Sequence, residues 1–304
     1  MEEGFMSFDH PLAVLQPGDL NRDRGSVLTT STWRFLAQGD SWFSIGQLPP
    51  WATGNLLFSL RLPSSAAAVT LASPGKTFAQ MIDWTREVKF ATYLAGGTLA
   101  YAWDAILLSA GGNDLFDAIL TMPDEPDPGK ATRRLLQDPE RVPSSGAINR
   151  YLRPEGWQAF FAMIEDCFVA MIDKRDAPTS RSNGVPIFVH TYDCPQPRNA
   201  PAGPGIGPWL SRAYAAYHIP PDDWLKLTTY IIQQWAQYLA GINGKLVARG
   251  IAKPNIRPIY LIGTLNPDPP SSTGPSGDWE NEIHPSPQGY AKLGIAFENQ
   301  VTLA

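Results

Sequence analysis

Cysteine, charged residues and long apolar runs are all scarce in this chain. It has only two cysteines, Cys167 and Cys194, in 304 residues, which favours free thiols over a disulfide framework and leaves a single bridge between them open. No apolar run approaches the length of a membrane-spanning helix. Residues 1–7 also lack the positively charged and apolar regions of a secretory signal. We therefore expect a cytoplasmic protein with no transmembrane segment, and leaderless export stays open.

Basic clusters and metal-binding motifs are missing too. The net charge is −5 and the sequence pI is about 5.4, so nucleic acid is not expected as a partner. The four histidines are widely scattered and no His-Glu-x-x-His motif occurs, so no metal site is expected. Gly75-Lys76-Thr77 looks like the end of a phosphate-binding loop, but Thr70 occupies a position where that motif requires glycine. We expect no cofactor.

The chain has enough apolar residues to form the core of one large domain. Hydrophobic residues make up 43% of it and charged residues only 17%. Its 29 prolines and 26 glycines concentrate in a few segments, which indicates long ordered loops on a folded scaffold. We expect an N-terminal extension over residues 1–32 and a single domain over residues 33–304, with long loops at 121–148, 193–221 and 264–283.

Five short apolar runs predict the strands of this domain. They lack clean alternation, which is typical of strands buried on both faces of a parallel sheet: residues 33–38, 67–72, 104–110, 185–191 and 256–262. Segments with helical periodicity lie between or after them, at residues 78–84, 157–174, 222–247 and 286–301. The alternation predicts a three-layer α/β/α sandwich with a five-stranded parallel sheet of the flavodoxin-like kind.

Residues with reactive or hydrogen-bonding groups follow four of these runs. Ser41 follows the first run, Gly75 the second and Asn113 the third, and His284 lies in the loop after the fifth. Because ligands bind outside the carboxyl ends of the strands in such sheets, we expect these residues on one rim. A serine, a backbone N–H group, an amide and a histidine suffice for acyl transfer. Taken singly, Gly39-Asp40-Ser41 and Gly111–Asp114 are ordinary turn sequences.

Taken together, in this order, the motifs resemble those of the SGNH, or GDSL, hydrolase family. Gly39-Asp40-Ser41 matches the family's nucleophile block, and Gly75 matches its glycine block. Gly112-Asn113-Asp114 matches the asparagine block, and His284, in Asn281–Pro285, matches the histidine block. The resemblance covers about residues 33–300, which is nearly the whole chain.

The resemblance implies a cofactor-independent hydrolase of carboxylic esters that works through an acyl-enzyme. Ser41 would be the nucleophile and His284 the general base, while the N–H groups of Ser41 and Gly75 and the Asn113 amide would form the oxyanion hole. Small-molecule esters, lipids and acylated sugars all remain open as substrates. The alternative is a catalytically silent module of the same fold that binds a glycan or an acyl chain.

The third catalytic residue departs from the family pattern. The family carries aspartate three residues before the histidine, and this chain has Asn281 there. The Asn281 carbonyl oxygen would accept the imidazole Nδ1–H, provided that neighbouring groups orient the amide. Asp278, six residues before His284, is the alternative partner of the ring.

Aromatic residues near the rim are candidates for the wall of an acyl or sugar pocket. We expect about half of them to be plain packing: Trp42, Phe43, Trp51, Trp209, Tyr214, Tyr217 and Trp279. With the three long loops, they favour a bulky or partly apolar substrate. His190, at the end of the fourth run, is expected to be a hydrogen-bonded core histidine.

Overall fold

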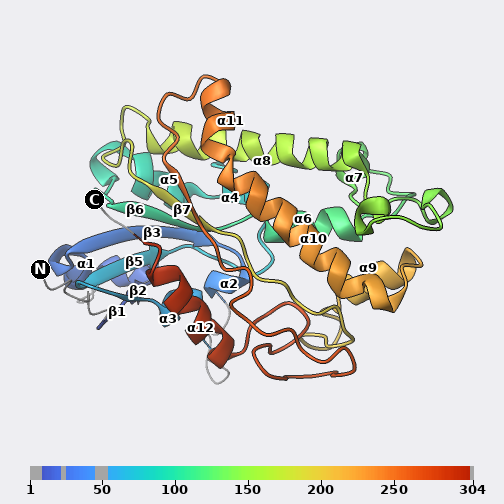
Figure 1. The fold of residues 1–304 in the computed structure, drawn as a ribbon. Helices are drawn as coiled ribbons and strands as arrows, with labels where there is room; N and C mark the ends of the chain where they lie inside the picture. Colours follow the sequence, from blue (N-terminus) through green and yellow to red (C-terminus); the bar gives the residue numbers. More distant parts are fainter. Residues whose placement is uncertain (1–8, 22–24, 45–53, 302–304) are drawn as a thin grey trace, which may run out of the picture.

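Six parallel strands form the sheet at the centre of the molecule (Figure 1). In the computed structural model, which describes residues 9–21, 25–44 and 54–301, they lie in the order β2-β5-β3-β6-β7-β8. Every neighbouring pair in this sheet is parallel. The strands are β2 Ala13–Leu15, β3 Trp33–Gly39, β5 Ala66–Thr70, β6 Ala105–Ser109, β7 Ile187–His190 and β8 Ile256–Ile259.

Five of these strands coincide with the five predicted runs, but the predicted strand count was one short. The additional strand, β2, pairs with β5 through Ala13 and Ala67 and comes from the segment expected to be an N-terminal extension. Only three residues long, it leaves too weak a pattern in the sequence to be recognised. A separate antiparallel pair joins β1, His10–Pro11, to β4, Arg61–Leu62.

The central strands are buried on both faces, as their continuous apolar runs predicted. All residues of β5, β6 and β7 are buried. The helix α8 covers one face with Phe160, Ile164 and Phe168, spaced four residues apart and each fully buried. This double burial confirms the three-layer α/β/α prediction.

Helices cover the sheet on both sides. Figure 1 shows α8, α10 and α11 over one face, with α3 and α12 against the other. The helices are α1 Gly25–Thr30, α2 Ser41–Ser44, α3 Leu56–Ser59, α4 Phe78–Met81, α5 Val88–Ala95, α6 Gly112–Leu120, α7 Pro128–Arg133, α8 Pro154–Arg175, α9 Leu210–Ala216, α10 Pro221–Ala240, α11 Ile242–Ala248 and α12 Pro287–Glu298.

The helix starts follow from local sequence. Proline occupies the first turn of α8, α10 and α12, where its missing N–H group costs no hydrogen bond. Ser286 caps α12 by accepting the Gly289 N–H, and Thr77 and Gln80 form a capping box at α4. The helix predicted over residues 222–247 is divided into α10 and α11 at Gly241. The predicted loops 121–148 and 193–221 contain α7 and α9.

The strand order places the topological switch point of the sheet between β3 and β6. Without the edge strand β2, the order is that of a doubly wound sheet in which the first strand lies between the second and the third. Ligands bind at the point where the chain switches sides, outside the carboxyl ends of the strands. Here that point lies where β3 ends at Gly39 and β6 ends at Ser109, which are paired in register.

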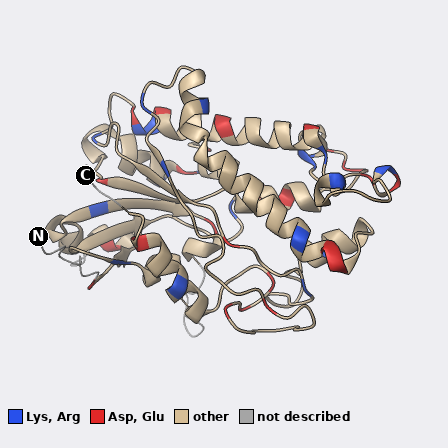
Figure 2. Ribbon diagram, viewed as in Figure 1, with Lys and Arg blue, Asp and Glu red and all other residues tan. Residues whose placement is uncertain are grey.

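The described residues carry mixed charge and two free thiols. Figure 2 shows Lys and Arg interspersed with Asp and Glu along the ribbon. No helix in the described part of the chain has the length and hydrophobicity to cross a membrane. Cys167 and Cys194 are both free thiols, so the predicted absence of a disulfide framework is confirmed.

Candidate active site

The turn after β3 places Ser41 at the carboxyl end of the strand. Gly39 lies so close to β6 that an added Cβ would meet the Ser109 Cβ at 2.7 Å, so only glycine fits there. The N–H group of Asp40 donates to the Ser109 carbonyl at 3.1 Å. The Asp40 side chain then accepts the N–H of Trp42 at 3.0 Å, which closes the turn around Ser41. Ser41 is the first residue of α2 and is 7% exposed.

His284 links Ser41 to Asn281 through both ring nitrogens. Its Nε2 lies 2.9 Å from Ser41 Oγ, and its Nδ1 lies 3.0 Å from Asn281 Oδ1. The same Oδ1 accepts the backbone N–H groups of Ile283 at 3.1 Å and His284 at 3.0 Å. The structure therefore brings together the nucleophile, the base and the orienting residue that the sequence predicted.

This arrangement determines the tautomer of His284. Two backbone N–H groups point at one atom of the Asn281 amide, so that atom is the oxygen and not the nitrogen. The Nδ1 atom must then carry the proton, since it faces an acceptor. The lone pair of Nε2 is left facing the Ser41 hydroxyl, which is the orientation a general base needs.

Burial keeps the ring neutral. His284 is 6% exposed, and desolvation lowers its pKa to about 4. The Asn281 amide carries no charge that would favour the imidazolium. At neutral pH the ring is therefore unprotonated at Nε2 and able to accept a proton.

Asp278, the alternative partner of His284, is engaged elsewhere. Its carboxylate accepts two hydrogen bonds from Lys292 Nζ, at 2.7 and 2.8 Å. It also accepts the backbone N–H of Asn266 at 3.0 Å. Among the described residues its hydrogen bonds go to these two partners and not to His284, so the geometry favours Asn281.

The three predicted oxyanion donors are the N–H groups of Ser41 and Gly75 and the Asn113 amide. No hydrogen bond of the Ser41 or Gly75 N–H group occurs within the described part of the chain. Gly75 adopts a φ of +76°, a left-handed conformation that favours glycine. The Asn113 Nδ2 donates to the Lys76 carbonyl at 3.0 Å, which ties the start of α6 to the turn that holds Gly75.

The bond from Asn113 to Lys76 gives the predicted oxyanion donor a structural hydrogen bond as well. A primary amide has two N–H groups, so one remains for a ligand.

A buried polar network that the sequence analysis missed supports the Ser41 turn. Asp40 accepts the Tyr192 hydroxyl at 2.6 Å and the Ser109 hydroxyl at 2.7 Å. His190 Nε2 lies 2.8 Å from Ser109 Oγ and the residue is fully buried, so its prediction as a hydrogen-bonded core histidine is confirmed. Burial raises the pKa of Asp40 to about 6, although these hydrogen bonds oppose the shift.

Tyr192 joins this network to the start of α6. It adopts a φ of +63°, which is uncommon for an aromatic residue. Its ring lies against Gly112, where an added Cβ would come within 2.6 Å of it. It also packs edge-on against Trp42 at 5.1 Å between ring centroids. The only signal in the sequence was its position just beyond the fourth apolar run.

The loop that carries His284 is held by two buried charged residues, which the sequence analysis also missed. Glu282 accepts backbone N–H groups of Arg198, Trp209, Leu210 and Ser211, and it thereby caps α9. Arg198 donates to the Asn281 carbonyl at 3.0 Å. Its guanidinium also lies 2.6 Å from the Asp268 carboxylate.

Most of the candidate rim aromatics are buried. Five of them are buried: Trp42, Phe43, Tyr214, Tyr217 and Trp279. Trp209 is partly exposed, and its ring centroid lies 5.7 Å from that of His284. Trp51 lies outside the described residues.

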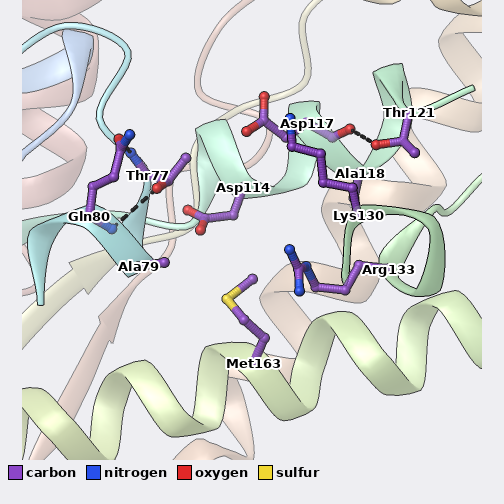
Figure 3. A pocket seen from close by; sticks show the side chains of 10 residues that line it. All are labelled: Thr77, Ala79, Gln80, Asp114, Asp117, Ala118, Thr121, Lys130, Arg133 and Met163. Carbon is purple, nitrogen blue, oxygen red and sulfur yellow. Dashed lines mark hydrogen bonds between the residues drawn. The ribbon is translucent and has the colours of Figure 1, made fainter. Parts of the chain in front are cut away.

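A polar cavity of about 370 Å³ lies between α4, α6, α7 and α8 (Figure 3). Asp114, Asp117, Lys130 and Arg133 surround it, and Thr121 also lines it. The predicted loop 121–148 therefore contributes to this cavity, and neither Ser41 nor His284 lines it. No group of three or more His, Cys, Asp or Glu side chains that would hold a metal occurs among the described residues.

Of the comparisons with known proteins, only the one with solved structures finds matches. No family model and no curated protein matches the chain. A lipase from a goat rumen metagenome shares 12% identity over 88% of this chain and 97% of its own, with a TM-score of 0.47. A protein from Slackia heliotrinireducens assigned to the SGNH hydrolases shares 12% identity over 88% and 98%, with a TM-score of 0.38.

An acetyl-xylooligosaccharide esterase from Geobacillus shares 14% identity over 89% of this chain and 94% of its own, with a TM-score of 0.39. These likenesses concern the fold. At identities of 12–14% and TM-scores of 0.38 to 0.47, the chain's own residues must carry any statement about activity.

We predict that Tyr192→Phe destabilises the protein by about 1.5–3 kcal/mol, because a buried hydrogen bond to a carboxylate is lost. Urea titration at a pH above the raised pKa of Asp40 measures the change. Tyr214→Phe is the matched control, since the Tyr214 hydroxyl is also buried but pairs with the neutral Thr228 hydroxyl. Equal losses of unfolding free energy in the two variants would show that the bond to Asp40 contributes no more to stability than the bond to Thr228.

Proposed function

We propose that this chain is a serine hydrolase of carboxylic esters with a Ser41–His284–Asn281 triad, related in mechanism to the SGNH hydrolases that its motifs resemble. The observation that carries the proposal is the unbroken hydrogen-bond chain from Ser41 Oγ through His284 to Asn281 Oδ1. Two backbone N–H groups fix the direction in which the hydrogen bonds of this chain are donated. The chain ends on the Ser41 hydroxyl, which lies at the carboxyl end of a central strand.

The reaction proceeds through an acyl-enzyme. Ser41 Oγ attacks the ester carbonyl while His284 Nε2 takes the hydroxyl proton. The tetrahedral intermediate collapses, the C–O bond to the alcohol breaks, and the imidazolium gives the proton to the departing alcohol. Water then attacks the acyl-enzyme with the same proton transfers, which releases the acid and restores Ser41. No cofactor takes part.

In this proposal three donors stabilise the oxyanion: the N–H groups of Ser41 and Gly75 and the second N–H of the Asn113 amide. Each such donor contributes roughly 2.7–4 kcal/mol to the transition state in known hydrolases. The bond from Asn113 to Lys76 keeps the two turns that supply these donors together.

Asparagine in the third position of the triad orients the His284 ring but carries no charge that would stabilise the imidazolium. In a serine protease, replacing the triad aspartate by asparagine costs about 10⁴-fold in kcat, largely because the histidine takes the wrong tautomer. Here the N–H groups of Ile283 and His284 hold the amide oxygen toward Nδ1, so the wrong tautomer is disfavoured. What is lost is only the electrostatic stabilisation of the imidazolium.

We predict that the purified protein hydrolyses p-nitrophenyl acetate and that Ser41→Ala lowers kcat by about 10⁶-fold, to near background. Initial rates at saturating substrate measure this. Ser44→Ala is the matched control, because Ser44 lies in the same helix and is equally buried. Activity that survives in Ser41→Ala would refute the proposed nucleophile.

A second prediction concerns the pH dependence of kcat/KM. Activity requires neutral His284, so it should rise with pH through a midpoint near the lowered pKa of about 4. Asn281→Asp places a carboxylate beside the ring, which favours the imidazolium and should raise this midpoint by roughly one to three pH units.

Asp278→Asn serves as the control for this experiment. The described partners of Asp278 are Lys292 and Asn266, so the midpoint should stay where it is in the unmodified protein. A midpoint that moves in Asp278→Asn and stays in Asn281→Asp would assign the orienting role to Asp278 instead.

A further inference from the structure

A small apolar cavity lies directly beside the proposed catalytic residues. Its volume is about 20 Å³. Three of the residues that line it are immediate chain neighbours of the nucleophile, the asparagine oxyanion donor and the base: Trp42, Gly112 and Ile283. Ser41, Asn113 and His284 do not line the cavity themselves, but each is joined by one peptide bond to a residue that does.

The walls of this cavity are apolar and firmly held. Leu115 and Phe116 of α6 and Ile232 of α10 contribute side chains. The Trp42 indole N–H donates to the Ile283 carbonyl at 3.3 Å, which joins two of the lining residues. A ligand would make dispersion contacts with such a wall and few hydrogen bonds.

The one charged side chain in the lining, Asp193, is already satisfied. Its carboxylate accepts backbone N–H groups of Cys194 at 2.7 Å, Gly263 at 2.8 Å and Leu265 at 2.6 Å. It is therefore not free to recognise a polar group of a ligand. The cavity selects an apolar group.

The size of the cavity limits that group to about the size of a methyl. A single water molecule needs about 10–15 Å³ by this measure. A space of about 20 Å³ therefore holds one small group. A longer alkyl chain would require the wall to move.

The two halves of an ester need different surroundings at such a site. The alcohol must leave after it takes a proton from His284, so it needs an open path. Trp209, partly exposed, lies beside the His284 ring, and Ile206 in the same loop is 57% exposed. The acyl group stays on Ser41 until water attacks, so an enclosed cavity suits it.

We propose that this cavity is the acyl pocket and that the chain hydrolyses esters of acetic acid or of an acid of similar length. The inference rests on the ester hydrolysis proposed above. Bulk in the substrate belongs to the alcohol, on the side of Trp209. Ile232 closes the cavity from α10 and sets the limit on acyl length.

The test compares p-nitrophenyl acetate with p-nitrophenyl butanoate. The unmodified protein should prefer acetate by at least about tenfold in kcat/KM, because one methylene too many in a tight apolar pocket costs roughly 10–200-fold. Ile232→Ala removes part of the wall, so it should raise the ratio of butanoate to acetate by about tenfold or more.

Ile231→Ala is the matched control. Ile231 is the preceding residue of α10, is 1% exposed and does not line the cavity. It should lower the melting temperature in the same way as Ile232→Ala and leave the ratio of butanoate to acetate unchanged.

The outcomes separate the pocket from the proposed function. A protein that hydrolyses both esters equally well, or an Ile232→Ala ratio that moves no further than that of Ile231→Ala, would overturn the pocket assignment while ester hydrolysis stands. If the folded protein hydrolyses neither ester and no other ester of a short acid, the proposed function fails and the inference falls with it.

Discussion

The hydrogen bond from His284 Nδ1 to Asn281 Oδ1 is the interaction on which the site depends. It decides which ring nitrogen carries the proton, and therefore whether Nε2 can act as a base toward Ser41. An amide can present either oxygen or nitrogen to the ring, so the bond has value only if the amide is held one way. The N–H groups of Ile283 and His284 supply that constraint.

The loop that carries this bond is itself fixed by buried charge. Glu282 and Arg198 are almost completely buried, which is costly unless each charged group is fully paired. Glu282 meets this need with several backbone N–H groups, and Arg198 with Asp268 and the carbonyls of Ser272, Gly274 and Asn281. These bonds also position Trp209 beside the base. The same contacts that stabilise the long loops thus shape the open side of the site.

Much of this arrangement was readable in the sequence, for reasons particular to parallel sheets. Strands buried on both faces leave continuous apolar runs, and their carboxyl ends share one rim, so Ser41 and His284 were placed together although they lie far apart in the chain. The strand β2 was missed because three residues carry too little pattern. The oriented amide of Asn281 was expected, but its donors are backbone N–H groups, which leave no mark in the sequence. Tyr192 and Glu282 were missed because their roles depend on tertiary proximity.

The central claim is that Ser41 is an activated nucleophile, and covalent labelling tests it most directly. The protein would be treated with a fluorophosphonate, which reacts with serines activated by a neighbouring base. Intact mass and peptide mapping would then locate the adduct. We expect a single adduct on Ser41 and none in the Ser41→Ala protein. An adduct on another serine, or no adduct on folded protein that hydrolyses esters, would contradict the account.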